Sequence, residues 1–337
     1  MNVRRYWAVL MTRNREMLRE RSTLMWNILF PVMLIAGFAL LFQAQSTPYT
    51  VGLLSELDAW ASPPQITQLP QVGTLRYDEA AQALSALRRQ QIHLVLDLDQ
   101  RLYWVNAYSP QGQVLETLLA YTDAEFRRRL MGQQQLRYID WAMPGIIAMN
   151  MMFACLFGVG YVLVRYRKNG VLKRLRATPL SAFEFLAAHM TSRLLLVMVI
   201  STILLLGSLW TLNIVLLGRL FDLFVLGVLG TVCLSALGLL MAARTRSEEL
   251  TAGLINFLAW PMIFLSGAWF TIEGAPYWLQ TVAQFLPLTH LVEAGRRIML
   301  DGASLHDVAT HLWVLLAMTV VFLSLGSGLF NWSSDHR

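Results

Sequence analysis

Long apolar runs separated by short charged segments set the pattern of this chain. A membrane-spanning helix needs about 20 mainly apolar residues, because it must satisfy its backbone amides internally while crossing the hydrocarbon core. Six segments without Asp, Glu, Lys or Arg have about this length: residues 24–42, 142–164, 194–217, 223–243, 250–270 and 312–330. The pattern therefore predicts a polytopic α-helical membrane protein with six transmembrane helices.

Residues 43–140 follow a different pattern, in which strand-like and helix-like segments alternate. Strands are expected at 49–54, 73–77, 92–98 and 102–106, and helices at 78–90 and 111–130, with a weaker helix at 60–69. This alternation predicts a small α/β domain with a mixed sheet, inserted between the first and second membrane helices.

Two further segments are amphipathic. Residues 1–23 place Trp7, Leu10 and Met11 near helical spacing among arginines, which predicts a helix lying on the cytoplasmic membrane surface. A positively charged topology anchor is the alternative interpretation of this segment, and the two are compatible. Residues 271–309 combine aromatic and charged side chains, which predicts a re-entrant hairpin of two short helices in the outer leaflet.

Charge then assigns the two sides of the membrane. The chain is 56% hydrophobic and only 14% charged, against about 25% charged in soluble domains. Its net charge of +6 does not indicate nucleic-acid binding, because the basic residues gather before the first span and in the loop at 165–182. By the positive-inside rule both lie in the cytoplasm. Both termini, including the tail at 331–337, are then cytoplasmic, and the α/β domain is extracytoplasmic.

The first apolar run is expected to remain as a helix. It is longer than the 7 to 15 residues of an ordinary signal-peptide core, and 23 residues precede it. A cleaved signal peptide is therefore the less favoured interpretation.

Motor and enzyme chemistry is missing from the sequence. A phosphate-binding loop of the G-x-x-x-x-G-K-[ST] type is absent, and neither lysine of the chain follows a glycine. None of the six apolar segments contains an acid that could couple transport to an ion gradient. His189 and Arg193 precede the third segment, and we expect them near the cytoplasmic interface, where an arginine can snorkel.

The histidines do not predict a metal site. They are scattered along the chain, and His306, Asp307 and His311 come nearest to a cluster. Ordinary interface residues explain these three better than a metal centre does. Cys155 and Cys233 fall inside apolar segments, where small packing residues are expected.

The basic loop contains a short amphipathic segment. Leu172 and Leu175 share one helical face, Lys173, Arg174 and Arg176 surround them, and Pro179 ends the segment. A topology-setting loop and a grip for a cytoplasmic partner are both compatible with this composition.

Four motifs in order resemble one family, the type-2 permeases of ATP-binding cassette (ABC) transporters, which are the membrane subunits of exporters. Residues 138–145 (YIDWAMPG) resemble the entry to the second helix, and residues 169–180 (NGVLKRLRATPL) resemble the coupling-helix loop. Residues 285–290 (FLPLTH) and 293–297 (EAGRR) together resemble the hairpin before the last helix. An outer domain between helices one and two is typical of the multidrug and lipid-like branch.

The resemblance implies a division of labour. Two permeases, identical or paralogous, dock separate cytoplasmic ABC ATPase subunits, which bind ATP and Mg²⁺, so this chain itself needs no cofactor or metal and is no enzyme. The implied ATPase-coupling residues are Gly170, Val171, Leu172, Lys173, Arg174, Leu175, Arg176 and Thr178. The implied outer-hairpin residues are Pro287, Glu293, Arg296 and Arg297.

By the same resemblance, the second and fifth helices form the substrate path. The candidates are Met149, Asn150, Phe153, Phe157, Asn256, Trp260 and Phe264. Methionine and aromatic side chains suit adaptable contact with bulky apolar cargo, although plain helix packing also explains each of them.

The expected function is export of an amphipathic, drug-like or lipid-like compound across a bacterial inner membrane, with a periplasmic adaptor as a possible partner of the outer domain. Two alternatives are a membrane scaffold or sensor with a ligand-binding outer domain, and a polysaccharide-exporting permease.

Overall fold

The computed structural model describes residues 3–19, 25, 28–29, 31–33, 35, 49–54, 64–69, 71–88, 92–106, 109–129, 137–243, 245, 247–269 and 276–329. The chain divides into two compact units, one made of Met1–Ala36 with Ala142–Arg337 and the other of Gly37–Trp141. The predicted first span at 24–42 lies largely outside the described residues, and the tail at 331–337 lies wholly outside them.

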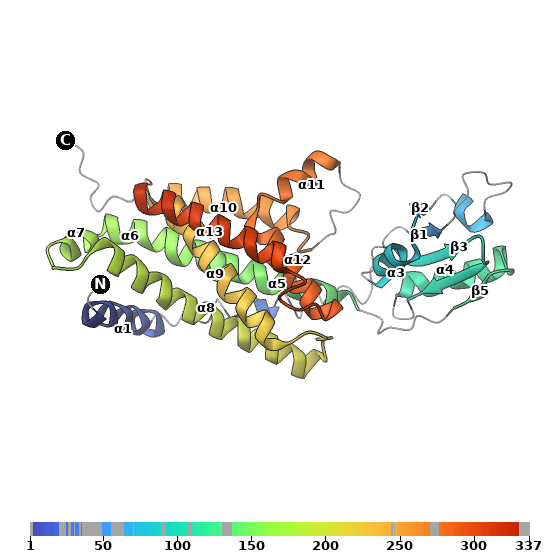
Figure 1. The fold of residues 1–337 in the computed structure, drawn as a ribbon, viewed down its shortest axis with the longest axis horizontal. Helices are drawn as coiled ribbons and strands as arrows, with labels where there is room; N and C mark the ends of the chain where they lie inside the picture. The colour runs from blue at the N-terminus through green and yellow to red at the C-terminus, as the bar shows by residue number, and fades with distance from the viewer. Residues whose placement is uncertain are drawn as a thin grey trace. The chain divides into compact units, whose positions relative to one another are not determined.

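The first unit is helical (Figure 1). In chain order it contains α1 (Val3–Arg19), α5 (Tyr138–Cys155), the π-helix η2 (Leu156–Tyr161), α6 (Val162–Lys168), α7 (Val171–Arg176), α8 (Ala182–Leu212), α9 (Leu220–Ala242), α10 (Glu248–Leu265), α11 (Tyr277–Ala283), α12 (Pro287–Asp301) and α13 (Ala309–Leu329). Helix α9 is central, since it packs against α8, α12, α13 and η2.

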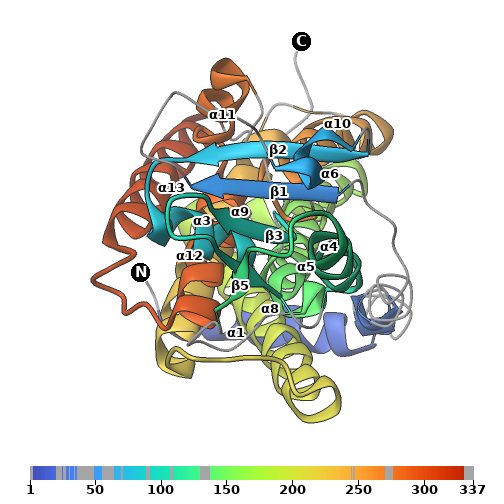
Figure 2. The same cartoon turned by 90° about the vertical axis from the view of Figure 1, so that its right-hand side faces the viewer.

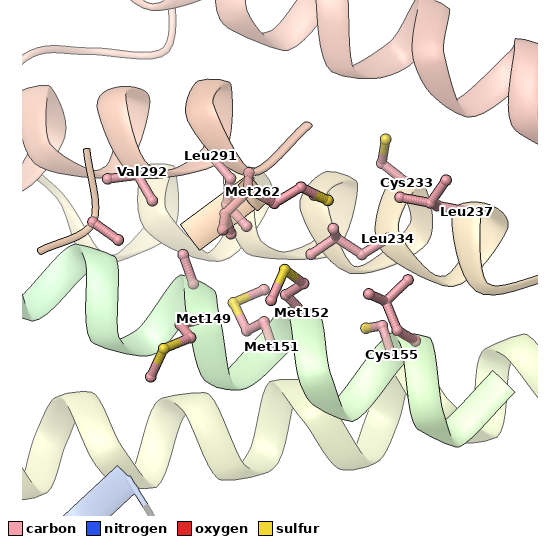
Figure 3. Packing of buried hydrophobic residues seen from close by; sticks show 14 of the residues in the cluster. Met149, Met151, Met152, Cys155, Cys233, Leu234, Leu237, Met262, Leu291 and Val292 are labelled. Atoms are coloured by element: carbon pink, nitrogen blue, oxygen red, sulfur yellow. The ribbon is translucent and has the colours of Figure 1, made fainter. Parts of the chain in front are cut away.

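The core of this unit is rich in methionine. Met149, Met151 and Met152 of α5 are buried in one cluster with residues of α9, α10 and α12. Figure 3 shows these side chains beside Leu234, Met262 and Leu291. Unbranched thioether side chains fill irregular gaps between helices, so this part of α5 is a packing face.

Glycines bring α9 close to the helix that contains η2. A Cβ atom at Gly160 would lie 2.9 Å from the Gly238 carbonyl oxygen, and one at Gly238 would lie 3.2 Å from the Cys155 carbonyl oxygen. Small residues that let helix backbones approach are typical of membrane helix pairs.

Four helical stretches of the described chain are long and apolar enough to cross a membrane: Tyr138–Lys168, Ala182–Leu212, Leu220–Ala242 and Ala309–Leu329. They contain all or most of the predicted spans at 142–164, 194–217, 223–243 and 312–330. The predicted fifth span corresponds to α10, which has Glu248 and Glu249 in its first turn and is not among the four. A count of six spans stays a prediction.

The helix that contains most of the predicted third span starts well before it. Helix α8 begins at Ala182, after a capping box formed by Ser181 and Glu184, and ends at Leu212, because Asn213 adopts a left-handed conformation with φ of 48°. The predicted start at residue 194 excluded the polar turns that precede it, although these turns belong to the same helix.

The second unit is built on a mixed five-stranded sheet with the order β2-β1-β3-β4-β5. The strands are β1 (Tyr49–Leu54), β2 (Val72–Tyr77), β3 (Leu94–Asp97), β4 (Leu102–Val105) and β5 (Arg127–Arg128). Strand β1 runs parallel to β2 and β3, with Val51 opposite Thr74 and Leu94, whereas β4 is antiparallel to β3. Figure 2 shows β2, β1 and β3 side by side.

Helices cover both faces of this sheet. Alternate residues of β1 point to opposite faces, so Val51 and Leu53 pack with Leu115 and Leu119 of α4 (Pro110–Thr122). Leu54 packs on the other face, in a cluster with residues of α3 (Ala80–Arg88). The mixed α/β fold expected of this segment is confirmed, while its extracytoplasmic location stays a prediction.

Two local expectations in this unit need correction. The helix predicted at 111–130 ends at Thr122, because the chain turns at Asp123 and then forms β5. The Asp123 carboxylate accepts hydrogen bonds from the backbone amides of Gln65 and Ile66 at 3.2 and 3.1 Å. These amides begin a 3-10 helix, η1 (Gln65–Gln68), which replaces the longer helix expected at 60–69; residues 60–63 lie outside the described part.

Candidate functional site

The basic loop folds into a short helix at the tip of a helical hairpin. Helix α6 ends at Lys168, the chain turns at Gly170 with φ of 69°, and α7 follows at once. The left-handed conformation at Gly170 suits glycine, which has no Cβ atom to clash. After α7, the Thr178 hydroxyl donates to the Leu175 carbonyl at 2.6 Å, and Ser181 then caps the start of α8.

Helix α7 is held by its apolar face. Leu172 is fully buried and packs in a cluster with Leu163 of α6, Phe185 of α8 and Leu239 of α9. Val171 and Leu175 are partly buried against the same cluster, and Val9 of α1 joins it. The prediction that Leu172 and Leu175 share a face is confirmed, but that face is turned toward the chain itself. Leu172 is therefore not available to a partner, while Val171 and Leu175 stay partly exposed.

The opposite side of this tip is exposed and basic. Lys173, Arg174 and Thr178 are exposed, and Gly170 is partly exposed. Arg176 is the last residue of α7. A rigid helix that presents two cations and a hydroxyl at the end of a long hairpin can contact another protein without losing its own support.

Helix α1 packs along α8 and so supports this hairpin. The Tyr6 hydroxyl donates to Thr191 Oγ1 at 2.8 Å, and the Ser192 hydroxyl donates to Asn14 Oδ1 at 2.6 Å. These bonds attach α1 along α8, beside which it lies in Figure 1. A guanidinium nitrogen of Arg5 also contacts the Pro179 carbonyl, directly after α7.

Arg13 adds a buried contact to this attachment. Its guanidinium lies over the Tyr166 ring, 4.9 Å from the centroid, and pairs with Glu16 at 2.9 Å. One face of α1 is thus committed to protein contacts. Val3, Trp7 and Met11, one turn apart on the helix, remain exposed. Contact of these residues with the membrane surface stays a prediction.

Arg167 joins α6 to the end of α9. Its side chain is buried and donates to the carbonyl oxygens of Ala242 at 3.0 Å, Thr245 at 2.7 Å and Ala243 at 3.4 Å. These carbonyls lie at the C-terminal end of α9, where a cation is favourable both as a donor and toward the helix dipole. Sequence reasoning treated Arg167 only as a topology signal.

Polar contacts also join this region to α10. The Tyr161 hydroxyl donates to Glu248 Oε2 at 2.7 Å, and the Lys168 ammonium lies 3.5 Å from Glu248 Oε1. The Ser247 hydroxyl donates to Glu249 at 2.6 Å, and this bond, with the nearby Lys168 charge, lowers the pKa of Glu249. Glu249 therefore stays ionised at neutral pH.

The expectation for His189 and Arg193 is wrong in one respect. Both belong to α8, and both are buried, with 1% and 7% exposure, so Arg193 does not snorkel to water. Its guanidinium occupies the place that a side chain at Gly158 would fill, 1.6 Å from an ideal Cβ there. A cation buried between apolar helices is a functional candidate by default. The sequence could have indicated this, because a third apolar segment extended by one residue toward the N-terminus would have included Arg193.

The predicted substrate residues fall into two groups. Met149 has 1% exposure and belongs to the packing core, and Asn150 is also buried. Phe153 and Phe157 are partly buried and stack at 6.3 Å between ring centroids. On α10, Trp260 and Phe264 are 48% and 51% exposed and stack at 6.2 Å. Asn256 is exposed one turn before Trp260.

A cavity of about 370 Å³ lies elsewhere, between α5, α8, α9 and α12. Its lining is apolar and includes Met151, Met198, Phe224, Leu291 and Met299. No residue of α10 lines it. The seven predicted substrate residues do not line it either, so sequence reasoning missed it, because it forms between helices distant in sequence.

The residues expected in the outer hairpin occupy α12. Pro287 is its first residue, where a missing amide proton costs little. Arg296 donates to the Gly267 carbonyl at 2.9 Å, and Arg297 pairs with Glu293 at 3.0 Å. Two short helices, α11 and α12, are present as expected, while their depth in the membrane stays a prediction.

These observations define a class of protein. Long apolar helices packed through glycines and methionines, with charged turns between them, make this chain a polytopic α-helical membrane protein. The ABC-2 type transporter model matches residues 90–300, and the chain belongs to this family.

Several named proteins are similar to parts of the chain. The protein named "Probable multidrug ABC transporter permease YbhR" of Escherichia coli K12 is 26% identical over 222 residues, which cover 66% of this chain and 60% of that protein. The "Inner membrane transport permease YhhJ" of the same organism is 28% identical over 185 residues, covering 54% of this chain and 49% of that protein.

A third relative comes from Bacillus subtilis 168. The "Linearmycin resistance permease protein LnrN" is 27% identical over 179 residues, covering 51% of this chain and 44% of that protein. The chain thus spans about three fifths or less of the length of these relatives.

Proposed function

We propose that this chain is the transmembrane permease subunit of an ABC exporter that moves an amphipathic, drug-like or lipid-like substrate out of the cytoplasm or inner leaflet. Separate ATPase subunits, with their own ATP and Mg²⁺, drive alternating access. A second permease, identical or paralogous, completes the transport pathway in a bacterial inner membrane, with both termini of this chain in the cytoplasm.

The observation that carries the proposal is the geometry of α7. The buried Leu172 seats this short helix on α6, α8 and α9, and Lys173, Arg174 and Thr178 face outward. A push on α7 would therefore reach three membrane helices through packed side chains. Transmission of this kind needs contiguous packing of elements that move as units.

For the substrate path, we favour the exposed aromatic face of α10 with Phe153 and Phe157. Asn256, Trp260 and Phe264 recur every four residues on one side of α10, and Trp260 and Phe264 are large apolar side chains that stay about half exposed in the described part of the chain. Cargo or the second permease would cover them. The names of two relatives mention multidrug transport and linearmycin resistance, which supports a drug-like cargo.

The coupling assignment is tested by charge reversal at the tip. The double variant Lys173→Glu/Arg174→Glu should lose at least tenfold in co-purification with the cognate ATPase and in ATPase activity of the complex in nanodiscs, because exposed cations steer and hold an acidic surface. The same reversal at Arg127 and Arg129 on the α/β unit, where both residues are also exposed, is the matched control.

Unchanged ATPase binding and turnover in the tip variant would contradict the assignment, as would equal losses in the control. Leu172→Ala gives a second measure. It should weaken coupling because α7 loses its packing against α6, α8 and α9, while the side chains of Lys173 and Arg174 are unchanged.

A further inference from the structure

Two histidine rings from different helices meet where α12 packs against α13. His290, in the first turn of α12, is buried, and His311, in the first turn of α13, is half-buried. Their Nδ1 atoms are 3.0 Å apart, and the ring centroids are 5.3 Å apart with 52° between the planes. His311 therefore pairs with a residue of another helix, and the candidates nearest to it in sequence, His306 and Asp307, are not part of the pair.

A backbone carbonyl orients the first of these rings. His290 Nε2 lies 2.8 Å from the Gln284 carbonyl oxygen. Because a carbonyl oxygen can only accept, Nε2 carries the hydrogen, and in the neutral ring the lone pair is on Nδ1, which faces His311. Metal-binding histidines are commonly fixed in this way, by a bond from the second nitrogen to a carbonyl or carboxylate.

We propose that His290 and His311 bind one divalent transition-metal ion of the Zn²⁺ or Cu²⁺ type through their two Nδ1 atoms, joining α12 to α13. Imidazole nitrogens favour such ions over Mg²⁺ and Ca²⁺. A tetrahedral Zn²⁺ with bonds of about 2.0–2.1 Å holds two nitrogens about 3.4 Å apart. The observed separation of 3.0 Å needs only a few tenths of an ångström of ring movement.

The remaining ligands would be water. Among the described residues, no group of three His, Cys, Asp or Glu is placed to hold a metal ion, so those residues supply two ligands. In the absence of metal, one hydrogen bond joins His290 Nδ1 and His311 Nδ1.

Neighbouring charges do not prevent binding. The charges of Arg297 and Glu293 of α12 both act on His311, and they oppose each other as an ion pair at 3.0 Å. In the turn before α13, Asp307 accepts bonds from the Ser304 amide and hydroxyl at 2.8 and 2.7 Å, and His306 is exposed. This proposal does not depend on the exporter function.

The test uses the tag-free full chain in nanodiscs, stripped of metal. Zn²⁺ affinity is measured by competition with a chromophoric chelator, and Cu²⁺ is added for electron paramagnetic resonance, in which coupling to two nitrogens reports the two rings. We expect one ion per chain with two coupled nitrogens. His311→Ala should weaken binding at least tenfold and leave at most one coupled nitrogen, and His290→Gln should do the same.

His306→Ala is the matched control, since it removes an exposed histidine five residues from His311 and should bind as the unmodified chain does. If His290→Gln fails to fold, the metal affinity of His311→Ala, a substitution at a half-exposed position, tests the proposal by itself. Absence of stoichiometric binding in the unmodified chain, retention of full affinity in His311→Ala, or loss of binding in His306→Ala would each overturn the proposal.

Discussion

Single side chains hold together helices that are far apart in sequence. Arg167 donates to three carbonyls at the end of α9, Arg13 lies over Tyr166, and Arg193 fills the space beside Gly158. In each case a cation takes part in packing inside the protein. In the sequence, Arg13 and Arg167 count only as positive charges that set the topology, whereas in the structure all three arginines make contacts between helices.

Replacing Arg167 with Met should lower the stability of the chain in detergent by roughly 2–4 kcal/mol, because hydrogen bonds from a charged donor are lost and buried acceptors are left without it. Thermal or SDS unfolding measures this. Arg174→Met, which removes an exposed cation from the neighbouring helix α7, should change stability by less than about 0.5 kcal/mol. Equal effects of the two substitutions would contradict the role given to Arg167.

His93 makes the α/β unit sensitive to pH. Burial lowers the pKa of His93, and its Nδ1 accepts from the Thr50 amide at 3.1 Å, which requires a neutral nitrogen there. Because the folded pKa lies below the unfolded value of about 6.5, stability is fully present above that value and falls as pH decreases through it toward the folded pKa.

Hydrogen-exchange protection factors of β1 and β3 in the full chain should therefore decrease between pH 7.5 and pH 5. In His93→Gln this decrease should be much smaller. A pH profile unaffected by the substitution would show that another group is responsible.

At the scale of elements, close backbone contact decides which helices pair. The helix at 138–168 and α9 approach through Gly160 and Gly238, and the π-helix η2 lies at this contact. Insertions of the π type often accompany functional sites in helices. The length of the apolar segments predicted both helices. Which helix packs against which depends on the positions of glycines, because only a residue without a side chain lets the two backbones come this close.

Gly160→Ala should destabilise the chain by about 1–3 kcal/mol, since the added methyl group would press on the Gly238 carbonyl and the backbones must separate. Gly207→Ala, in α8, has nothing within 4 Å of its added methyl group. It should be neutral or stabilising by up to about 1 kcal/mol, because alanine favours helix. Unfolding in detergent compares the two, and a neutral result at Gly160 would contradict the close packing.

At the scale of the whole molecule, the sidedness of the two units follows from charge. The tip at α7 is basic and short, so the positive-inside rule predicts that it lies in the cytoplasm and that the α/β unit lies outside.

Single-cysteine labelling checks this arrangement. A membrane-impermeant maleimide should label Gln100→Cys, in an exposed turn of the α/β unit, in intact spheroplasts. It should label Ala177→Cys, exposed after α7, only after permeabilisation. The native Cys155 and Cys233 are buried and serve as the unlabelled background. Labelling of both positions from the same side would contradict the topology.

The sequence by itself determined the membrane class, the four long apolar helices, the alternation of strands and helices at 49–122, and the amphipathic character of α7. These features depend on hydrophobic period and segment length, which are local properties. Only the tertiary structure decided that Met149 is packed inside, that Arg193 is buried, that Arg167 binds the end of α9 and that His290 meets His311. Each of these depends on contacts between helices distant in the chain, and such contacts are set by shape and by glycine positions that no single segment reveals.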